Sequence, residues 1–462
     1  MNLFLPSDQR PIHFVGIAGA GMSALALLAL RRGIRVTGSD RAAEGAPDLV
    51  TGGATVVTGQ DPKLVEGARV VVVSAAIADD HPELQRAREL GLPIVTRKRA
   101  LADLVATGLT VAIAGTHGKT TTTVMTTEAL AAAGLDPTGL AGGRVGTWGG
   151  NARIGSDTLF VVEADEYDQA FLELEPTIAI INNVEPEHLE CYNGSAGELE
   201  AAFATFAGRA ETAIIGCADE ASDRVADQVA SRSSGTKILR FGGNTSEFSL
   251  RTITANRTGT VAVIGLPDGG EAVVRLKVPG VHNILNATAA IAVVATLGGD
   301  IPRALEALSQ FTGVGRRFEH RGEARGVLVV DDYAHHATEV RATLAAAHQA
   351  FPGRRIVAVF QPHLYSRTAA QHVALGDALA TAGLAVVTEV YGARETPIPG
   401  VTGRLVYDAV LKRGTPAEFA GGRAELLDMV AAAVHSGDVV LTLGAGDITT
   451  LGPELLARLR GA

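Results

Sequence analysis

The sequence contains few cysteines, few aromatic residues and no long uninterrupted apolar run. Of its 462 residues, two are cysteines (Cys191 and Cys217) and one is tryptophan. Two thiols cannot build the disulfide framework of a small secreted domain, so a reducing cytoplasm is the expected location. The apolar runs are too short or too interrupted by glycine to cross a bilayer, and no signal peptide is recognisable. We therefore expect a cytoplasmic protein that does not insert into membranes.

An excess of positive charge is also missing. The chain has 40 basic and 50 acidic residues, which give a net charge of -10. Without a dense run of lysine and arginine, such a chain is a poor binder of nucleic acid, and the short basic clusters at 97–99 and 316–317 better suit a small anionic ligand. Hydrophobic residues (47%) and glycine (54 residues) are plentiful, as in a globular chain. The length suffices for about three domains.

Apolar runs alternate with helix-compatible segments along most of the chain. This alternation predicts parallel, doubly wound α/β sheets. We expect an N-terminal Rossmann-like domain over residues 1–106, a central P-loop ATPase-like domain over 107–314 and a C-terminal Rossmann-like domain over 315–462. Within the central domain, residues 237–278 alternate apolar and polar side chains around Asp268-Gly269-Gly270, a pattern that predicts antiparallel hairpins.

The most informative stretch is a glycine-bounded turn after the apolar run 111–114. A strand, a turn and a helix in this order point backbone N–H groups at one spot near the positive end of a helix dipole, which suits a polyphosphate. Lys119 would neutralise β/γ-phosphate charge, and we expect Lys119→Ala to leave the fold intact because the loop would lie on the surface. The residues of this predicted loop are Gly115, Thr116, His117, Gly118, Lys119, Thr120 and Thr121.

Two further polar residues follow apolar runs of the central domain. Glu163 comes directly after the run 159–162, and His188 lies in the segment after the run 177–181. Neighbouring strands would bring both near the Thr120 hydroxyl. Together the three side chains could bind one or two Mg²⁺ ions, with Mn²⁺ as an alternative.

A second glycine-rich turn lies near the N-terminus, with the spacing Gly16-x-x-Gly19-x-Gly21. The backbone N–H groups of such a turn, together with the helix dipole, favour a diphosphate at the helix N-terminus. Asp40 stands where a Rossmann protein places its ribose-binding acid, so a nicotinamide-dependent dehydrogenase is an alternative. That alternative leaves the second phosphate loop and the nearby carboxylates unexplained.

The C-terminal third carries histidine and arginine motifs at the ends of apolar runs. Asp331-Asp332-Tyr333-Ala334-His335-His336 follows one run, and His363 and Arg367 follow the next. Arg367 could clamp a carboxylate with its two parallel donors, and it would converge with His363 if the segment is helical. Arg317 lies at the boundary of the central and C-terminal domains, where an arginine can reach a γ-phosphate when the domains close.

Two asparagines that precede this domain boundary are spaced so that both would lie on one face of a helix. Asn283 and Asn286 are three residues apart and follow His282. Side chains at this spacing point the same way, so the pair could read a purine edge. The alternative is that His282 or Asn283 caps the helix.

These motifs together resemble the Mur ligase family of ATP-dependent amide-forming enzymes. The phosphate loop Gly115-Thr116-His117-Gly118-Lys119-Thr120-Thr121, the Glu163-Ala164-Asp165-Glu166 segment and the histidine-rich motifs of the last third carry the resemblance. It implies that ATP phosphorylates the lactyl carboxylate of UDP-N-acetylmuramate and that the amine of L-alanine then attacks the acyl phosphate. The absence of lysine from 120 through 236 favours the alanine-adding branch, because most sister ligases resemble one another in using a carbamylated lysine there.

The resemblance also implies a role for each candidate residue. It places Lys119, His188, Arg317, His335 and His363 in catalysis, and Thr120, Glu163 and His188 on magnesium. Besides the phosphate loop, the implied ATP-binding residues are His282, Asn283, Asn286, Arg317 and Asp332. The implied sugar-nucleotide residues are Gly19, Ala20, Gly21, Met22, Ser39, Asp40, Ser74 and Arg97. The implied alanine-site residues are Tyr333, His335, His363 and Arg367.

Three alternatives stay open. A related ligase that attaches a preformed peptide to the same sugar nucleotide shares nearly every motif, and the segment 390–395 favours the alanine enzyme. A nucleotide-sensing regulator would not need the paired histidine and arginine motifs. A folate-type polyglutamate ligase is the third alternative, and the missing lysine and the N-terminal nucleotide domain weaken it. The sequence predicts no oligomeric state.

Overall fold

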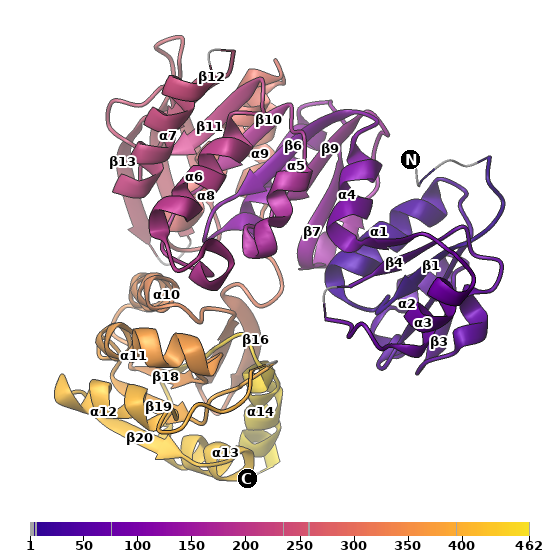
Figure 1. The fold of residues 1–462 in the computed structure, drawn as a ribbon. Coiled ribbons are helices and arrows are strands. Elements are labelled where there is room, and N and C mark those ends of the chain that lie inside the picture. The colour runs from indigo at the N-terminus through magenta and orange to yellow at the C-terminus, as the bar shows by residue number, and fades with distance from the viewer. Residues whose placement is uncertain are drawn as a thin grey trace. The chain divides into compact units, whose positions relative to one another are not determined.

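The structure is a computed structural model that describes residues 4, 7–74, 76–233, 235–256, 259–393 and 395–461. The described residues form four β-sheets, and the chain divides into two compact units (Figure 1). Unit 1 comprises residues 1–252, 262–274 and 285–310, and unit 2 comprises 253–261, 275–284 and 311–462. In the described part of the chain, no helix combines the length and the apolar character that a membrane span requires.

The N-terminal part of unit 1 is a parallel, doubly wound sheet, as the sequence predicts. Its strands pair in the order β3 (Thr55–Thr58), β2 (Val36–Asp40), β1 (Ile12–Val15), β4 (Val70–Val73) and β5 (Ile94–Thr96). The helices are α1 (Ala20–Arg31), α2 (Pro47–Thr51), α3 (Pro82–Glu89) and α4 (Arg97–Val105). The order reverses between β1 and β4, so the turns after these strands lie at the switch point where such sheets bind ligands.

The central part of unit 1 is a seven-stranded sheet. Its order is β12 (Lys237–Phe241), β11 (Thr212–Gly216), β10 (Ile178–Ile181), β6 (Leu109–Ala114), β9 (Leu159–Glu163), β7 (Thr138–Val145) and β8 (Gly150–Arg153). Only β8 runs antiparallel to its neighbour, β7. The helices are α5 (Lys119–Ala132), α6 (Ala196–Ala207), α7 (Glu220–Arg232), α8 (Val281–Thr296) and α9 (Ile301–Ser309). Because β6 lies between β9 and β10, the segments after these three strands meet at one edge of the sheet.

The predicted hairpin region begins later than the sequence suggests. Strands β13 (Leu250–Asn256), β14 (Gly259–Gly265) and β15 (Glu271–Leu276) form a separate antiparallel sheet. The prediction that hairpins start at residue 237 is wrong, because β12 pairs in parallel with β11. An edge strand that is covered on one face alternates buried and exposed residues just as a hairpin strand does, so periodicity alone cannot separate the two.

The C-terminal sheet lies in unit 2. Its order is β16 (Glu319–Ala324), β17 (Val327–Asp332), β21 (Val439–Leu443), β18 (Ile356–Phe360), β19 (Leu384–Thr388) and β20 (Ala417–Ala420), and only β16 is antiparallel. The helices are α10 (Ala337–Ala350), α11 (Tyr365–Leu379), α12 (Arg404–Lys412), α13 (Arg423–Ala433) and α14 (Leu451–Gly461).

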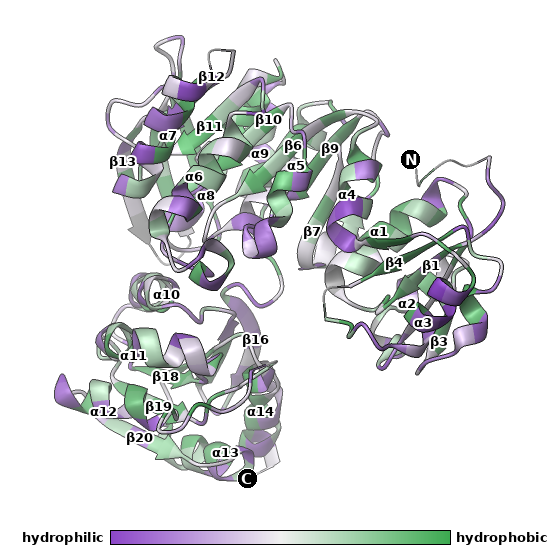
Figure 2. Ribbon diagram, viewed as in Figure 1, coloured by the Kyte–Doolittle hydropathy of each residue, from purple (hydrophilic) through white to green (hydrophobic). Residues whose placement is uncertain are grey.

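Each face of the C-terminal sheet has its own hydrophobic core. Val330 belongs to the core under α10, α11 and α12, whereas its neighbour Val329 belongs to the core under α13 and α14. Successive side chains of a strand point to opposite faces, so a strand buried on both sides is apolar throughout. Figure 2 shows this concentration of hydrophobic residues on the strands. The α/β fold class predicted from the sequence is confirmed.

Candidate active site

The predicted phosphate loop joins β6 to α5. Gly118 is the N-cap of α5 and has φ 81°, and Gly115 has φ 131°. A Cβ atom on Gly115 would approach the backbone N of Asn182 to 3.0 Å, so the turn packs directly on the end of β10. Only glycine combines this backbone conformation with this close approach. The loop therefore presents the N-terminus of a 14-residue helix, as a phosphate site requires.

The segment after β10 holds the loop in shape. Asn183 Oδ1 accepts from the His117 backbone N–H at 2.8 Å, and Asn182 Nδ2 donates to the His117 carbonyl at 3.2 Å. The Thr116 hydroxyl accepts from the backbone N–H of Glu185 at 2.8 Å. Two neighbouring asparagines after a buried strand were a visible signal, but sequence reasoning gave them no role.

Lys119 takes part in a buried ion pair. Its Nζ lies 2.7 and 2.9 Å from the two carboxylate oxygens of Glu166 and 2.7 Å from the Gly115 carbonyl oxygen. The Glu166 side chain is only 2% exposed. Burial alone would lower the pKa of Lys119, but the negative charges of Glu166 and Asp165 raise it. The ammonium group is thus held charged at the mouth of the loop.

This ion pair corrects the expectation for Lys119→Ala. The sequence predicts a surface loop, whereas the lysine is the charge partner of a buried carboxylate. Removing one partner of a buried pair leaves the other uncompensated and destabilises the fold. Glu166 belongs to the Glu163-Ala164-Asp165-Glu166 segment, for which the sequence predicts a role only at Glu163.

The three predicted metal-binding residues come from the three strands that meet at this edge. Thr120 opens α5 after β6, Glu163 ends β9, and His188 lies beyond β10. The Glu163 carboxylate accepts from the backbone N–H of Gly142 and adds to the negative charge around Lys119. The His188 ring packs edge-on against Tyr167 at 5.0 Å, which brings the segments after β9 and β10 together. Among the described residues, no three His, Cys, Asp or Glu side chains gather as metal ligands.

A pocket of about 560 Å³ opens at the ends of β1, β2 and β4 in the N-terminal sheet. Its lining includes four residues predicted to bind the sugar nucleotide, Gly19, Ser39, Asp40 and Ser74. Arg97 reaches the same glycine turn, since a Cβ atom on Gly21 would lie 2.9 Å from its Nη1. The lining also contains side chains that can hydrogen-bond and were not predicted from the sequence: Arg41, Gln60, Asp80 and His81. They follow no motif, and only the fold brings them together.

Several of the predicted pocket residues have internal partners. Asp40 Oδ2 accepts from the backbone N–H of Ala18 at 2.9 Å, so this carboxylate shapes the glycine turn. The Ser39 hydroxyl donates to Glu83 at 2.6 Å. The Met22 side chain is 1% exposed and belongs to the core, which leaves only its backbone for a ligand. The side chain of Ala20 lies outside the described residues.

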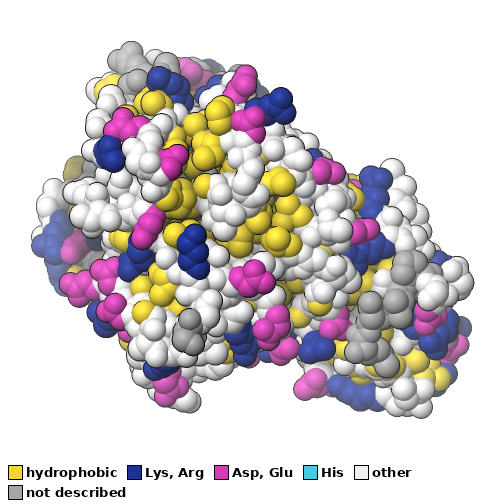
Figure 3. Space-filling model, turned by 90° about the horizontal axis from the view of Figure 1, so that it is seen from above, with side chains coloured by type: hydrophobic (Ala, Val, Ile, Leu, Met, Phe, Trp, Pro, Cys, Tyr) yellow, Lys and Arg dark blue, Asp and Glu magenta, His cyan; other side chains and the backbone are white. Residues whose placement is uncertain are grey.

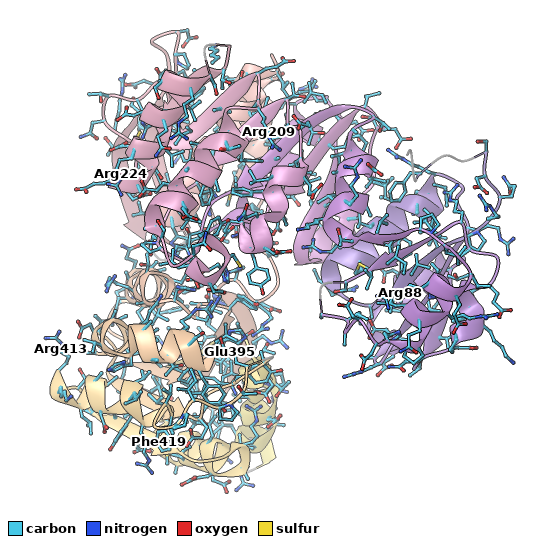
Figure 4. All side chains as sticks on the ribbon, in the orientation of Figure 1. Arg88, Arg209, Arg224, Glu395, Arg413 and Phe419 are labelled. Atoms are coloured by element: carbon cyan, nitrogen blue, oxygen red, sulfur yellow. The ribbon has the colours of Figure 1, made fainter. Side chains whose placement is uncertain are left out.

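The C-terminal motifs lie together at one edge of their sheet. His335 follows β17 and His363 follows β18, and β21 lies between these two strands. The two imidazole rings lie 5.6 Å apart, and Arg367 Nη1 lies 3.1 Å from His363 Nδ1. Burial lowers the pKa of His335 to about 3. Of the segment 390–395, Tyr391 stacks on His363, Glu395 (Figure 4) accepts from Ser366, and Arg394 lies outside the described residues.

Both arginines of the domain boundary stack on one tyrosine of unit 2. The guanidinium carbons of Arg316 and Arg317 lie 4.8 and 4.9 Å from the centre of the Tyr333 ring. Arg316 also donates to the Gly444 carbonyl at 2.7 Å, which ties it to the turn after β21. Arg316 is therefore held within unit 2, and the role of Arg317 on the γ-phosphate stays a prediction.

Asp332 anchors the same boundary segment. Its two oxygens accept from the backbone N–H groups of Phe318 and Ala334, each at 2.7 Å. Burial raises the pKa of Asp332 to about 6, against the opposing effect of Arg317 and these two hydrogen bonds. Both carboxylate oxygens thus have partners within the protein, and the role on the ribose stays a prediction.

The two asparagines of α8 have different surroundings. Asn286 Oδ1 would lie 2.7 Å from a Cβ atom on Gly118, so this amide borders the phosphate loop. Asn283 Nδ2 instead donates to the Pro279 carbonyl at 2.7 Å and supports the start of the helix. An N-cap accepts from a backbone N–H, so this donor contact is not a helix cap, and both readings of Asn283 stay predictions. His282 packs beside Gly280 in the turn before the helix.

Three family models match successive parts of the chain. They are described as "Mur ligase family, catalytic domain" at residues 11–108, "Mur ligase middle domain" at 113–294 and "Mur ligase, glutamate ligase domain" at 316–446. The UDP-N-acetylmuramate–L-alanine ligase of Renibacterium salmoninarum is 43% identical over 458 residues, covering 98% of this chain and 97% of that protein. The chain belongs to the Mur ligase family. The enzyme of the same name from Paenarthrobacter aurescens is 44% identical, with 97% of each chain covered.

Solved structures show the same relationship for this Mur ligase. The UDP-N-acetylmuramate–alanine ligase of Thermotoga maritima matches with a TM-score of 0.83 and 31% identity, covering 98% of this chain and 100% of that one. A murein peptide ligase of Psychrobacter arcticus matches with a TM-score of 0.71 and 25% identity, covering 98% and 99%. The family predicted from the sequence motifs is confirmed.

Proposed function

We propose that this Mur ligase uses ATP to join L-alanine to the lactyl carboxylate of UDP-N-acetylmuramate, a step of peptidoglycan precursor synthesis. The observation that carries the proposal is the 43% identity, over 98% of the chain, with a protein named for this reaction. A carboxylate at neutral pH is a poor electrophile. ATP therefore has to convert it to an acyl phosphate before an amine can attack.

We assign the phosphate loop and Lys119 to the triphosphate of ATP. The helix N-terminus and the charged ammonium supply positive charge where the transferring phosphoryl group needs it. Thr120, Glu163 and His188 offer hydroxyl, carboxylate and imidazole ligands, a set that fits Mg²⁺ or Mn²⁺. One or two bound ions would neutralise phosphate charge. His282, Asn283, Asn286 and Asp332 are assigned to the nucleoside, and Arg317 to the γ-phosphate.

We assign the pocket of the N-terminal sheet to the UDP moiety. The glycine turn at 16–21 and Arg97 supply donors for a diphosphate, and 560 Å³ suffices for a nucleotide. Tyr333, His335, His363 and Arg367 are assigned to L-alanine, because a guanidinium binds a carboxylate and an imidazole can accept from an amine. The proposed domain boundaries are 1–106, 107–314 and 315–462, and the proposed location is the cytoplasm.

The deciding experiment is phosphate release from ATP in the presence of Mg²⁺ and UDP-N-acetylmuramate. Three reactions are compared, with L-alanine, with a tripeptide, and without an acceptor. We expect release with L-alanine only. Release driven by the tripeptide would instead identify a peptide-attaching ligase, the class of the Psychrobacter arcticus structure. No acceptor-dependent release would favour a regulator that binds nucleotide.

A further inference from the structure

The two neighbouring imidazoles of unit 2 have different hydrogen-bond partners. A neutral imidazole carries its proton on one nitrogen and a lone pair on the other, and the partners of each nitrogen decide which is which. His335 and His363 are close enough, at 5.6 Å between ring centres, to contact one small ligand together. Their tautomers therefore determine which ligand groups they can bind.

His335 has two acceptors on the same nitrogen. Its Nδ1 lies 2.9 Å from the Tyr333 carbonyl oxygen and 3.3 Å from a Glu339 carboxylate oxygen. Since neither group can donate, Nδ1 carries the proton and Nε2 carries the lone pair. Burial lowers the pKa of His335 to about 3, so the ring is neutral at pH 7. In the part of the chain that the structure describes, Nε2 has no hydrogen-bond partner, and the side chain is 15% exposed.

His363 has the opposite arrangement. Its Nδ1 lies 3.1 Å from Nη1 of Arg367, and a guanidinium can only donate. Nδ1 is thus an acceptor, which puts the proton of the neutral ring on Nε2. The ring stacks on Tyr391 at 5.9 Å with an interplanar angle of 14°, so its plane is fixed.

The geometry points to a site in which the two histidines distinguish the ends of an amino-acid zwitterion. Nε2 of His335 accepts a hydrogen bond from the amine, while Nε2–H of His363 and the Arg367 guanidinium donate to the carboxylate. This inference rests on the proposed function, because it orients L-alanine for attack on the acyl phosphate. A ligand bound the other way round would set two donors against its ammonium group.

Glu339 is the positioning residue of this arrangement. Its carboxylate accepts from the backbone N–H groups of His335 and His336, at 3.0 and 3.3 Å, at the start of α10. The carboxylate is therefore fixed where it faces Nδ1 of His335. Its charge favours the Nδ1–H tautomer without any contact to the ligand.

The tautomers can be measured without any substrate. We expect ¹⁵N NMR of the full-length, ¹⁵N-histidine-labelled protein to show His335 as the Nδ1–H form and His363 as the Nε2–H form, with signals assigned by His335→Gln and His363→Gln. His348 is an internal reference, because its Nε2 faces the Thr381 carbonyl at 2.9 Å. A His335 signal of the Nε2–H form would overturn the inference.

The amine contact can be separated from the carboxylate contact by kinetics. Propionate has the carboxylate and methyl group of L-alanine but no amine. His335→Asn keeps a donor near the Tyr333 carbonyl and lacks the Nε2 acceptor. We expect it to raise KM for L-alanine at least tenfold and to change the inhibition constant of propionate less than twofold. Equal changes for both molecules, or no change for either, would overturn the inference.

Failure of the proposed function gives a different result. In that case the wild-type protein releases no phosphate with L-alanine, while the tautomers are still read from the NMR spectrum.

If His335→Asn does not fold, Glu339→Gln gives a second test. We expect it to raise KM for L-alanine and to leave KM for ATP unchanged, whereas a purely structural role would alter both.

Discussion

At the scale of single residues, the Lys119–Glu166 ion pair links the chemistry of the site to the stability of unit 1. Lys119→Ala leaves a carboxylate that is 2% exposed without its partner. We expect a loss of about 3 kcal/mol of unfolding free energy, because breaking a buried pair leaves an uncompensated charge. Thermal unfolding followed by circular dichroism measures this loss, and a phosphate assay measures the loss of phosphoryl transfer.

The double variant Lys119→Ala/Glu166→Gln is the matched control for that prediction. Neutralising position 166 should recover part of the lost melting temperature and none of the activity. If the single variant melts at the wild-type temperature, the ion pair does not contribute to stability. If it keeps full ATP turnover, Lys119 is not part of the mechanism.

Arg367 is the residue predicted to clamp the carboxylate of L-alanine. It is 7% exposed and also contacts His363. We expect Arg367→Ala to raise KM for L-alanine on the order of 30- to 1,000-fold. The variant loses a desolvated ion pair with the substrate carboxylate, which contributes about 2–4 kcal/mol of binding free energy. The measurement is initial rate against L-alanine concentration.

Arg413→Ala is the control for the Arg367 prediction. Arg413 (Figure 4) pairs with Asp377 on an exposed surface, with a side chain 56% exposed. Its removal should leave KM for L-alanine unchanged. An unchanged KM in Arg367→Ala would assign the carboxylate to another donor.

At the scale of elements, the turn between β6 and α5 depends on the absence of a side chain at Gly118. A Cβ atom there would lie 2.7 Å from Asn286 Oδ1, in a backbone conformation with φ 81°. Gly134, at the other end of α5, has φ 88° and no atom within 4 Å of the same position. Both substitutions to alanine incur a backbone strain of about 1–2 kcal/mol, and only Gly118→Ala adds a collision.

We therefore expect Gly118→Ala to lower both the melting temperature and the affinity for ATP more than Gly134→Ala does. Calorimetric titration with ATP and Mg²⁺ measures the affinity. Equal effects of the two substitutions would show that the contact with Asn286 is unimportant.

A buried network joins β1, β2 and α3 beneath the N-terminal pocket. Glu83 is fully buried and is contacted by His13 Nε2 at 3.1 Å and by the Ser39 hydroxyl at 2.6 Å. Burial alone would raise the pKa of Glu83, but the hydrogen bonds from His13, Ser39 and the Asp61 backbone lower it below its usual value of 4.5. The native state therefore favours the ionised carboxylate more than the unfolded chain does.

The sign of the resulting pH dependence follows from linkage. A lowered folded pKa gives stability that is present above pH 4.5 and is lost as the pH falls toward the folded pKa. Denaturant unfolding of unit 1 between pH 3 and 7 measures it, and Glu83→Gln should flatten this dependence. Glu66→Gln, at a pair that is 50% exposed, should leave it in place. An identical pH dependence in all three proteins would exclude Glu83 as its source.

At the scale of the whole molecule, the C-terminal sheet has what it needs to fold alone. Its six strands carry a hydrophobic core on each face, both closed by helices of residues 337–461. We expect the fragment 314–462 to unfold cooperatively, because a domain of this size buries its own core. Thermal unfolding followed by circular dichroism tests this. Leu441→Asp, in the buried central strand β21, is the control and should abolish the transition.

The surface of the molecule agrees with the charge composition. Figure 3 shows basic and acidic side chains interspersed on the face that it presents. The basic residues on which the proposal depends are instead buried or partly buried, and three of them have contacts within the protein. Lys119 is paired with Glu166, Arg367 is buried, and Arg317 stacks on Tyr333.

Strongly apolar strands were predictable, and weakly patterned ones were not. The runs 356–360 and 439–443 match β18 and β21 residue for residue, because strands buried on both faces are continuously apolar. β7 contains three glycines, and β3 is a short edge strand with no buried residue, so neither carries a signal. The site residues with a strong local pattern were predictable as well, because glycine turns and polar residues that follow strands are visible in the sequence as motifs.

The sequence by itself determined the α/β class, the phosphate loop, the family and most of the candidate side chains, because these depend on local patterns of a few residues. Only the tertiary structure decided which partner each side chain has. It paired Lys119 with Glu166, drew Asp40 and Ser39 into internal hydrogen bonds, and gave the Nδ1 atoms of His335 and His363 different partners. Such pairings join residues from different strands. Their protonation and energetics depend on burial and distance, which no local pattern contains.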